Sequence, residues 1–249
     1  MSSHKSEVRN EAWSELLKVA KPDSRFHYNF AEFIADFDGS DRATAMFLEH
    51  SVFKSADPIF ITPDNCLEEL RYETLLAGKK ILMTTYGIRR GFWLLDPQEI
   101  DSKFLMYAST LDGMEKFGKH LSLRDIQESK LQISAMVTGT GAINMEGVRF
   151  GKGHGYFDLE WAMLYSVGAI QTTTAAVAFV HECQLLHQDL KPEVFDTVCD
   201  LVITNKRIIE LALGKAQKPK VGVVWDLLAD GMLEDIPPLQ ELKQMKITI

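Results

Sequence analysis

The sequence predicts an α/β protein in which a β-sheet carries helices on both of its faces. Short apolar runs of strand length alternate along the chain with longer stretches whose apolar residues recur at helical spacing. The composition, with 46% hydrophobic and 25% charged residues over 249 residues, is typical of a folded protein with a large buried core. No internal repeat and no long linker interrupts this pattern, so we predict a single domain over residues 1–249.

The predicted elements follow from local pattern. Residues 6–20 have apolar side chains at helical spacing, and Ser40 in the turn-forming sequence DGSD is the expected N-cap of a second helix. Apolar runs such as PIFI and LVIT have the length and residue types of buried strands. We predict strands at residues 58–61, 80–84, 103–107, 131–137, 174–180 and 201–204. We predict further helices at residues 67–77 and 158–168, and one or two in the tail from 224 to 244.

Charge and hydropathy exclude several classes of partner. With 27 basic and 35 acidic residues the net charge is −8, which argues against a general nucleic-acid binder. No apolar stretch approaches the ~18 residues that a membrane helix needs. The polar N-terminus lacks the apolar core of a secretory signal, and the three cysteines form no disulfide or metal pattern. A cytoplasmic protein that binds a small molecule is therefore expected, and the oligomeric state is left open.

The most informative segment is residues 147–160, which reads GVRFGKGHGYFDLE. Gly151, Gly153 and Gly155 remove side chains that would block close approach of a ligand. Backbone N–H groups in such a turn form an anion site, and the predicted helix that follows adds the partial positive charge of its N-terminus. The sequence therefore indicates a phosphate-binding loop, although a Gly-rich connection with solvated charges has the same pattern.

Charged side chains accompany this loop. Arg149 and Lys152 bring two cations to it, and Asp158 lies where the helix begins. Asp158 is suited either to cap that helix or to hold Mg²⁺ beside phosphates, because Mg²⁺ takes one or two carboxylates together with phosphate oxygens. His154 is a candidate acid/base group because imidazole titrates near neutrality, and a loop histidine that merely faces water fits equally well.

The segment resembles the motif R-x-G-x-G-x-G-Y-Y-D-R of the 5-formyltetrahydrofolate cyclo-ligase family, also called methenyltetrahydrofolate synthetases. The matching residues are Arg149, Gly151, Gly153, Gly155, Tyr156 and Asp158. The form found here is closer to a divergent branch of cyclo-ligase-like proteins, which reads RxGKGxGxxDLE. Lys5 and Arg9 match the N-terminal K-x-x-L-R of the family, and Pro63-Asp64 resembles its Pro-Glu pair.

The resemblance implies a fold and a reaction. The fold is the three-layer α/β/α arrangement with a mostly parallel sheet that is shared by NagB, RpiA and CoA-transferase-like enzymes. Enzymes of the family use ATP and Mg²⁺ to convert 5-formyltetrahydrofolate into 5,10-methenyltetrahydrofolate. The formyl oxygen takes the γ-phosphoryl group, N10 attacks the activated carbon, and phosphate leaves.

The resemblance also assigns roles to residues. The cofactor-binding candidates are Lys5, Arg9, Arg149, Gly151, Gly153 and Gly155, and the catalytic candidates are Lys152, His154 and Tyr156. Asp158 is the candidate ligand of Mg²⁺, and Asp64 is a candidate folate-binding residue in the place where the family has glutamate.

Two departures from the family pattern concern the substrate. Leu159 replaces the arginine that ends the motif, and Glu160 follows it, which should weaken or redirect binding of a polyanion. The sequence YGIRRGFW at residues 86–93 also differs from the cyclo-ligases. In it, Arg89 is suited to bind an anion and Trp93 to stack on a flat ring, unless the segment is a loop with solvated arginines and buried aromatics.

Three functions are consistent with these observations. The first is the ATP-dependent cyclo-ligase reaction on 5-formyltetrahydrofolate. The second is a related enzyme that keeps the phosphate loop and acts on a different small anionic metabolite, as the two departures suggest. The third is a folate-binding module without catalysis, which the retained phosphate loop disfavours. Fold alone does not decide among them, because one scaffold hosts many chemistries.

Overall fold

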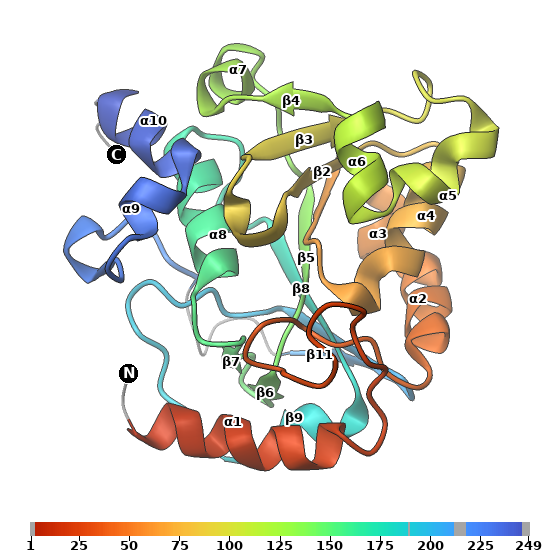
Figure 1. Cartoon of the computed structure of the whole chain (residues 1–249), viewed down its shortest axis with the longest axis vertical. Coiled ribbons are helices and arrows are strands. Elements are labelled where there is room, and N and C mark those ends of the chain that lie inside the picture. Colours follow the sequence, from red (N-terminus) through yellow and green to blue (C-terminus); the bar gives the residue numbers. More distant parts are fainter. Residues whose placement is uncertain (1–2, 189, 212–217, 246–249) are drawn as a thin grey trace.

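The computed structural model describes residues 3–188, 190–211 and 218–245, with side chains from residue 8 onward (Figure 1). Within these ranges a central sheet of eight strands runs between two layers of helices. In spatial order the strands are β11 (Ile208–Glu210), β10 (Leu201–Thr204), β8 (Ala175–Val180), β5 (Ala135–Gly139), β1 (Ile59–Ile61), β2 (Ile81–Thr84), β3 (Phe92–Leu95) and β4 (Lys119–Leu121).

The sheet is mainly parallel, as the resemblance implied. Strands β10, β8, β5, β1 and β2 run parallel to one another, and β11, β3 and β4 are added antiparallel at the two edges. All residues of β1, β2, β5 and β10 are buried, which explains why these strands read as continuous apolar runs. The carboxyl ends of the five parallel strands meet at one edge of the sheet.

One face of the sheet is covered by the helices that follow the N-terminal segment. They are α2 (Ser40–Glu49), α3 (Ser51–Ser55), α4 (Glu68–Leu76), α5 (Leu105–Ala108) and α6 (Leu111–Phe117). The 3₁₀ helices η1 (Asn65–Leu67) and η3 (Ser102–Phe104) precede α4 and α5. Phe47, Leu70 and Met114 from these helices join Val137 and Val177 of the sheet in one apolar cluster.

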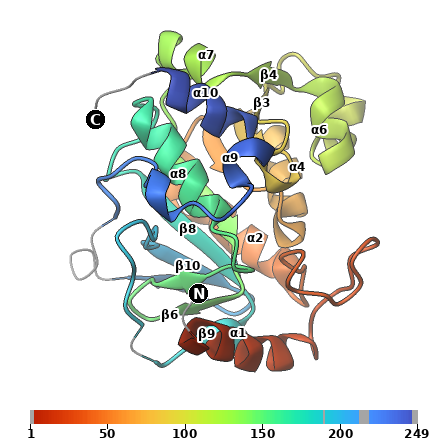
Figure 2. The same ribbon diagram turned by 60° about the vertical axis from the view of Figure 1, so that its left-hand side comes forward.

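The opposite face is covered by helices from the middle and the end of the chain (Figures 1 and 2). They are α7 (Leu123–Glu128), α8 (Tyr156–Ser166), α9 (Met232–Asp235) and α10 (Pro237–Met245). Trp161 of α8 and Leu239 of α10 pack with Met136 and Ala178 of the sheet in a second apolar cluster. The two clusters make the three-layer arrangement, because each belongs to one face of the sheet.

A small second sheet lies beside the carboxyl edge of the large one. Within the described ranges it has the order β7 (Arg149–Phe150), β6 (Ala142–Asn144) and β9 (Leu185–Leu186). Helix α1 (Ser3–Leu16) packs on it through Val8 and Ala12. Three further 3₁₀ helices are η2 (Tyr86–Ile88), η4 (Glu182–Gln184) and η5 (Trp225–Leu227). The small sheet therefore connects the N-terminal helix to the segment that carries the glycine loop.

Two predicted elements are wrong. Residues 103–107 are helical, in η3 and α5, because only Leu105 and Ala108 of α5 are buried and their spacing is that of a helix. Ser40 is the first residue of α2 and is buried, whereas the N-cap is Gly39, whose φ of 85° is the left-handed conformation that glycine adopts readily. At residues 86–93, η2 and a turn lead into β3; Arg89 and Arg90 are exposed and Phe92 is buried, so the segment fits the alternative of solvated arginines and buried aromatics.

Candidate active site

A cleft of about 570 Å³ opens at the carboxyl ends of the parallel strands. Asp64 after β1, Tyr86 after β2 and Gly139 at the end of β5 line it. The glycine loop at residues 151–155, between β7 and α8, forms the facing part of the cleft. This is the place where open α/β sheets bind ligands, because the loops that follow neighbouring parallel strands converge there.

The glycine loop is an open cradle at the N-terminus of α8. Gly153 has a φ of 107°, and Gly155, the N-cap of α8, has a φ of 69°. A Cβ atom built on Gly151 or Gly155 would meet no described atom within 4 Å. Packing within the protein therefore does not require the missing side chain at Gly151, and the loop leaves room for a group to approach its backbone. The positive end of the α8 dipole favours an anionic group there.

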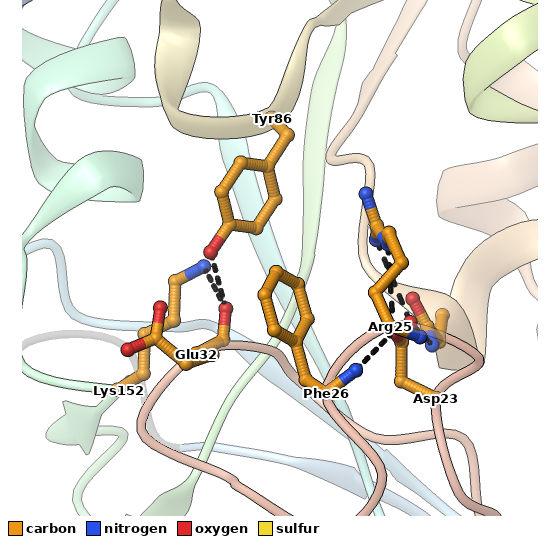
Figure 3. Close-up of polar contacts among 7 residues, drawn as sticks. Asp23, Arg25, Phe26, Glu32, Tyr86 and Lys152 are labelled. Carbon is orange, nitrogen blue, oxygen red and sulfur yellow. Dashed lines mark hydrogen bonds and ion pairs between the residues drawn. The ribbon is translucent and has the colours of Figure 1, made fainter.

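Lys152 points from the glycine loop into a set of aromatic rings (Figure 3). Its ammonium donates a hydrogen bond to the carbonyl oxygen of Glu32 at 2.9 Å and lies 4.3 Å from the ring centroid of Tyr86. The ring of Tyr156 is 5.4 Å away on the wall of the cleft. Burial lowers the pKa of Lys152, and the negative charge of Asp64 opposes that shift. Lys152 is therefore a partly desolvated cation inside the cleft.

The segment between α1 and α2 supplies a wall that the sequence did not predict. The Tyr86 hydroxyl donates to the same carbonyl of Glu32 at 2.6 Å, and the Phe26 ring stacks on Tyr86 at 5.8 Å (Figure 3). The guanidinium of Arg25, which also lines the cleft, lies 5.5 Å from the Tyr86 ring centroid. The aromatic-rich sequence from 26 to 33 was the available signal, but its partners are distant in the sequence.

Asp23 fixes the turn that presents Arg25. Its carboxylate accepts hydrogen bonds from the backbone N–H groups of Arg25 and Phe26 and from the side chain of Asn65. Burial raises the pKa of Asp23, but these hydrogen bonds outweigh burial and bring its pKa down to about 2. The turn is therefore held by a carboxylate that stays ionised throughout the neutral range.

Asp64 is rigidly held at the end of β1. Its Oδ2 accepts hydrogen bonds from the Thr62 hydroxyl at 2.5 Å and from the Gly139 N–H at 2.9 Å. Behind it, the buried Arg71 donates to the carbonyl oxygens of Thr62 and Asp64 and also to that of Ser109. Burial raises the pKa of Asp64, and the bond from Thr62 opposes the rise. The structure thus brings Asp64 and Lys152, two residues to which the resemblance assigns a role, into the lining of one cleft.

Arg149 and Asp158 pair with each other. Arg149 Nη2 lies 2.6 Å from Asp158 Oδ1, and the Thr197 N–H donates to the same oxygen at 2.8 Å. The Arg149 guanidinium also packs 4.4 Å from the ring centroid of Phe157. Burial raises the pKa of Asp158, and the charge of Arg149 opposes that shift. The pair fastens β7 to α8, so neither charge is simply available to a ligand.

The magnesium role of Asp158 stays a prediction. Mg²⁺ would have to be held by Oδ2, because Oδ1 is already shared by Arg149 and Thr197. No group of three or more His, Cys, Asp or Glu side chains suited to a metal ion is present among the described residues. A single carboxylate remains compatible with Mg²⁺ that arrives on nucleotide phosphates, because that ion keeps several waters.

His154 and Tyr156 present stacked rings to the cleft. Their centroids are 5.4 Å apart and their planes differ by 14°. Burial lowers the pKa of His154, and the neighbouring charge of Lys152 lowers it further. Burial raises the pKa of Tyr156. Both rings are therefore uncharged at neutral pH.

The remaining predicted residues divide between the cleft and the surface. Arg9 of α1 lines the cleft, with its guanidinium 5.7 Å from the Trp13 ring centroid. Lys5 lies in α1, but its side chain is outside the described residues. Arg89 and Trp93 do not belong to the described lining of the cleft. Arg89 pairs with Asp235 at 3.2 Å, and the Trp93 ring packs edge-on against His120 within the antiparallel part of the sheet.

Glu160 is a buried acid in the wall of the cleft. Its Oε1 accepts a hydrogen bond from the Thr84 hydroxyl at 2.5 Å, and only 2% of the surface of Glu160 is exposed to solvent. Oε2 has no hydrogen-bond partner among the described residues. Burial raises the pKa of Glu160 to about 8, so the side chain is a neutral acid at pH 7. The sequence showed it only as an added negative charge, because its burial depends on the packing of α8 against β2.

Comparison with known proteins places this geometry in a family. Residues 1–205 match the model of the 5-formyltetrahydrofolate cyclo-ligase family. A methenyltetrahydrofolate synthase domain-containing protein of Danio rerio is 28% identical over 249 residues, which cover 97% of this chain and 62% of the relative. Its Homo sapiens counterpart is 29% identical over 246 residues, which cover 96% of this chain and 61% of the relative. The chain thus spans somewhat less than two thirds of the length of these relatives.

A solved structure supports the fold. The NMR structure of Aquifex aeolicus 5,10-methenyltetrahydrofolate synthetase superposes with a TM-score of 0.52 at 16% identity, covering 87% of this chain and 97% of that one. Within the described part of the chain, none of the helices has the length and apolar character needed to cross a membrane. The family match over most of the sequence, together with this fold, shows that the chain belongs to the 5-formyltetrahydrofolate cyclo-ligase family.

Proposed function

We propose that this protein uses ATP to convert 5-formyltetrahydrofolate into 5,10-methenyltetrahydrofolate. The observation that carries the proposal is the open glycine loop at the N-terminus of α8, with Lys152 beside it in the cleft. Together they provide hydrogen-bond donors and positive charge suited to phosphates, in a chain that belongs to the cyclo-ligase family. Asp64, which also lines the cleft, supports folate as the second ligand, because its carboxyl group can accept hydrogen bonds from the N–H groups of a pterin ring.

Phosphoryl transfer depends mainly on position and charge, and the residues of this cleft suit that requirement. The backbone N–H groups of residues 151–155 and the ammonium of Lys152 would hold the phosphates in line with the formyl oxygen of the folate. Mg²⁺ would neutralise charge on those phosphates, with Asp158 as the carboxylate predicted to hold it. The stacked His154 and Tyr156 rings would keep water away from the transferred group.

The Arg149–Asp158 pair has a positioning role in this scheme. Because it joins β7 to the first turn of α8, it fixes both ends of the glycine loop. Replacement of Asp158 by asparagine keeps an oxygen for Arg149 and Thr197 but removes the charge. We expect this variant to unfold at a lower urea concentration than the wild type as well as to lose activity.

A continuous absorbance assay tests the proposal. Purified protein is mixed with Mg-ATP and 5-formyltetrahydrofolate, and the near-ultraviolet absorbance of methenyltetrahydrofolate is followed with and without ATP. We expect ATP-dependent product and a loss of at least about 100-fold in kcat for Lys152→Met. Lys119→Met, at an exposed position on β4, is the control and should retain full activity. No turnover by folded wild-type protein that binds ATP would refute the proposal.

A further inference from the structure

One wall of the cleft comes from residues beyond the part of the chain that matches the family model. The match ends at residue 205, whereas residues 222–232, here called the C-terminal wall, line the cleft. Most of its lining side chains are apolar: Val223, Val224, Leu227, Leu228, Ala229 and Met232. Figure 2 shows the last part of this wall, at the start of α9, in front of α8. The wall therefore adds an apolar surface beside the glycine loop.

The C-terminal wall accounts for the altered end of the glycine motif. Leu159, which stands where the family motif has arginine, lines the cleft, as do Leu228 and Met232, and each of the three packs against the apolar cluster that includes Phe157. An arginine at this partly buried, apolar position would lose part of its hydration, which is unfavourable without a partner. Leu159 and the wall are thus parts of one apolar surface, so the lost cation does not by itself indicate a lost phosphate site.

The two ends of the cleft lie on opposite faces of the sheet. Phe33 and Ile34, which line the cleft together with Asp64, pack in the apolar cluster on the face covered by α2 to α6. Leu228 and Met232 pack on the cluster of the other face, which α7 to α10 cover. The glycine loop lines the same cleft, so a ligand bound at either end shares the cleft with it.

The charges at the two ends differ. Arg25 lines the end near Asp64, and its cation suits a ligand that carries carboxylates. The residues of the C-terminal wall that line the cleft carry no charge, and the carboxylates of Glu193 and Asp196 in the same cleft suit hydroxyl donors. A reduced folate has a negatively charged glutamate tail, whereas the base and ribose of ATP are neutral and carry hydroxyl groups.

We propose that the C-terminal wall binds the nucleoside of ATP, with Leu228 and Met232 against the purine ring, and leaves the end at Asp64 and Arg25 to the folate. The inference rests on the proposed function, because it takes ATP and a folate as the two ligands. A flat ring with weakly hydrated faces gains most from an apolar surface, and the phosphates attached to it then reach the glycine loop.

Two neighbouring residues of α9 provide a matched test. Met232 and Leu233 are both partly buried against the same apolar cluster, but only Met232 is among the residues that line the cleft within the described chain. The dissociation constants of Mg-ATP and of 5-formyltetrahydrofolate are measured separately by calorimetry for the wild type, Met232→Ser and Leu233→Ser. We expect Met232→Ser to weaken ATP binding about tenfold and folate binding less than twofold, and Leu233→Ser to change neither.

Other results would overturn the inference. Weaker folate binding with unchanged ATP binding in Met232→Ser would place the folate at the C-terminal wall instead. Equal ATP binding by the wild type and both variants would remove the wall from the site. If Met232→Ser does not fold, as judged by thermal unfolding, Leu228→Ala takes its place with the same expectation. Wild-type protein that binds ATP without turning over folate would refute the proposed activity, while the ATP comparison still decides the role of the wall.

Discussion

Replacement of Glu160 by glutamine should change how the stability of the protein depends on pH. The buried carboxyl group has a pKa of about 8 in the folded protein, against an ordinary value of 4.5. Between these values the folded state keeps the proton and the unfolded chain releases it, so the free energy of unfolding falls as pH rises. Glutamine is close in shape to the protonated acid and can still accept the hydrogen bond from Thr84. The variant should therefore lack this dependence.

The size of the effect follows from the pH interval between the pKa of Glu160 in the folded protein and its pKa in the unfolded chain. Each pH unit inside it changes the free energy of unfolding by about 1.4 kcal/mol per proton. From pH 5.5 to 7.5 we expect the free energy of unfolding of Glu160→Gln to rise by about 2.5 kcal/mol relative to that of the wild type. For a chain of this length that corresponds to a relative rise in Tm of about 5–10 °C.

Urea unfolding followed by circular dichroism at both pH values measures this difference directly. The change with pH of the variant minus the wild type is the quantity of interest, because other titrating groups contribute equally to both proteins. Glu128→Gln, at an exposed position on α7, is the control and should show no such change. A difference between Glu160→Gln and the wild type that is the same at pH 5.5 and 7.5 would show that Glu160 is ionised in the folded protein and would refute the reasoning.

Three other predictions concern the support of the cleft. Arg71→Met should lower the free energy of unfolding by about 3 kcal/mol, since three carbonyl oxygens lose their buried donor; a urea titration that shows less than 1 kcal/mol would contradict this. Gly155→Ala should lower the free energy of unfolding by about 1 kcal/mol, because the φ of Gly155 is positive. Gly151→Ala should leave urea unfolding unchanged and weaken ATP binding, as measured by calorimetry. A lower free energy of unfolding in Gly151→Ala would contradict the open cradle. ATP affinity should fall as pH rises, because Lys152 loses its proton, and the fall should begin below the pH at which an ordinary lysine titrates, because burial lowers the pKa of Lys152. Lys152→Arg should abolish this fall. An equal fall in the variant would assign the pH dependence to another group.

The sequence predicted the middle of the sheet well and its edges poorly. Strands β1, β2, β5, β8 and β10 are buried on both faces, so each leaves an apolar run that composition alone reveals. The antiparallel strands β3, β4 and β11 contain partly or fully exposed residues. Strands β4 and β11 are only three residues long and include charged side chains, and the apolar run of β3 follows directly on the polar sequence of residues 89–91. The run at 103–107 was misleading for the opposite reason, because Phe104, Met106 and Tyr107 are apolar but exposed.

The site was predictable where chemistry lies in adjacent residues. The glycine loop and Lys152 form one short segment whose residue types predict an anion site. Arg25 and Tyr86 reach the same cleft from distant parts of the chain, and only the fold brings them together. The pairing of Arg149 with Asp158 was equally hidden, since it depends on how β7 turns into α8.

The carbonyl oxygen of Glu32 determines which interaction Lys152 must give up when a ligand enters the cleft. It is a neutral acceptor, so an incoming phosphate that takes the ammonium of Lys152 replaces a dipole by a full charge and breaks no ion pair there. The hydroxyl of Tyr86 donates to the same oxygen and remains on it after the exchange. The departure of the lysine therefore leaves no buried acceptor without a donor, and the cation can change partners while the segment around Glu32 stays in place.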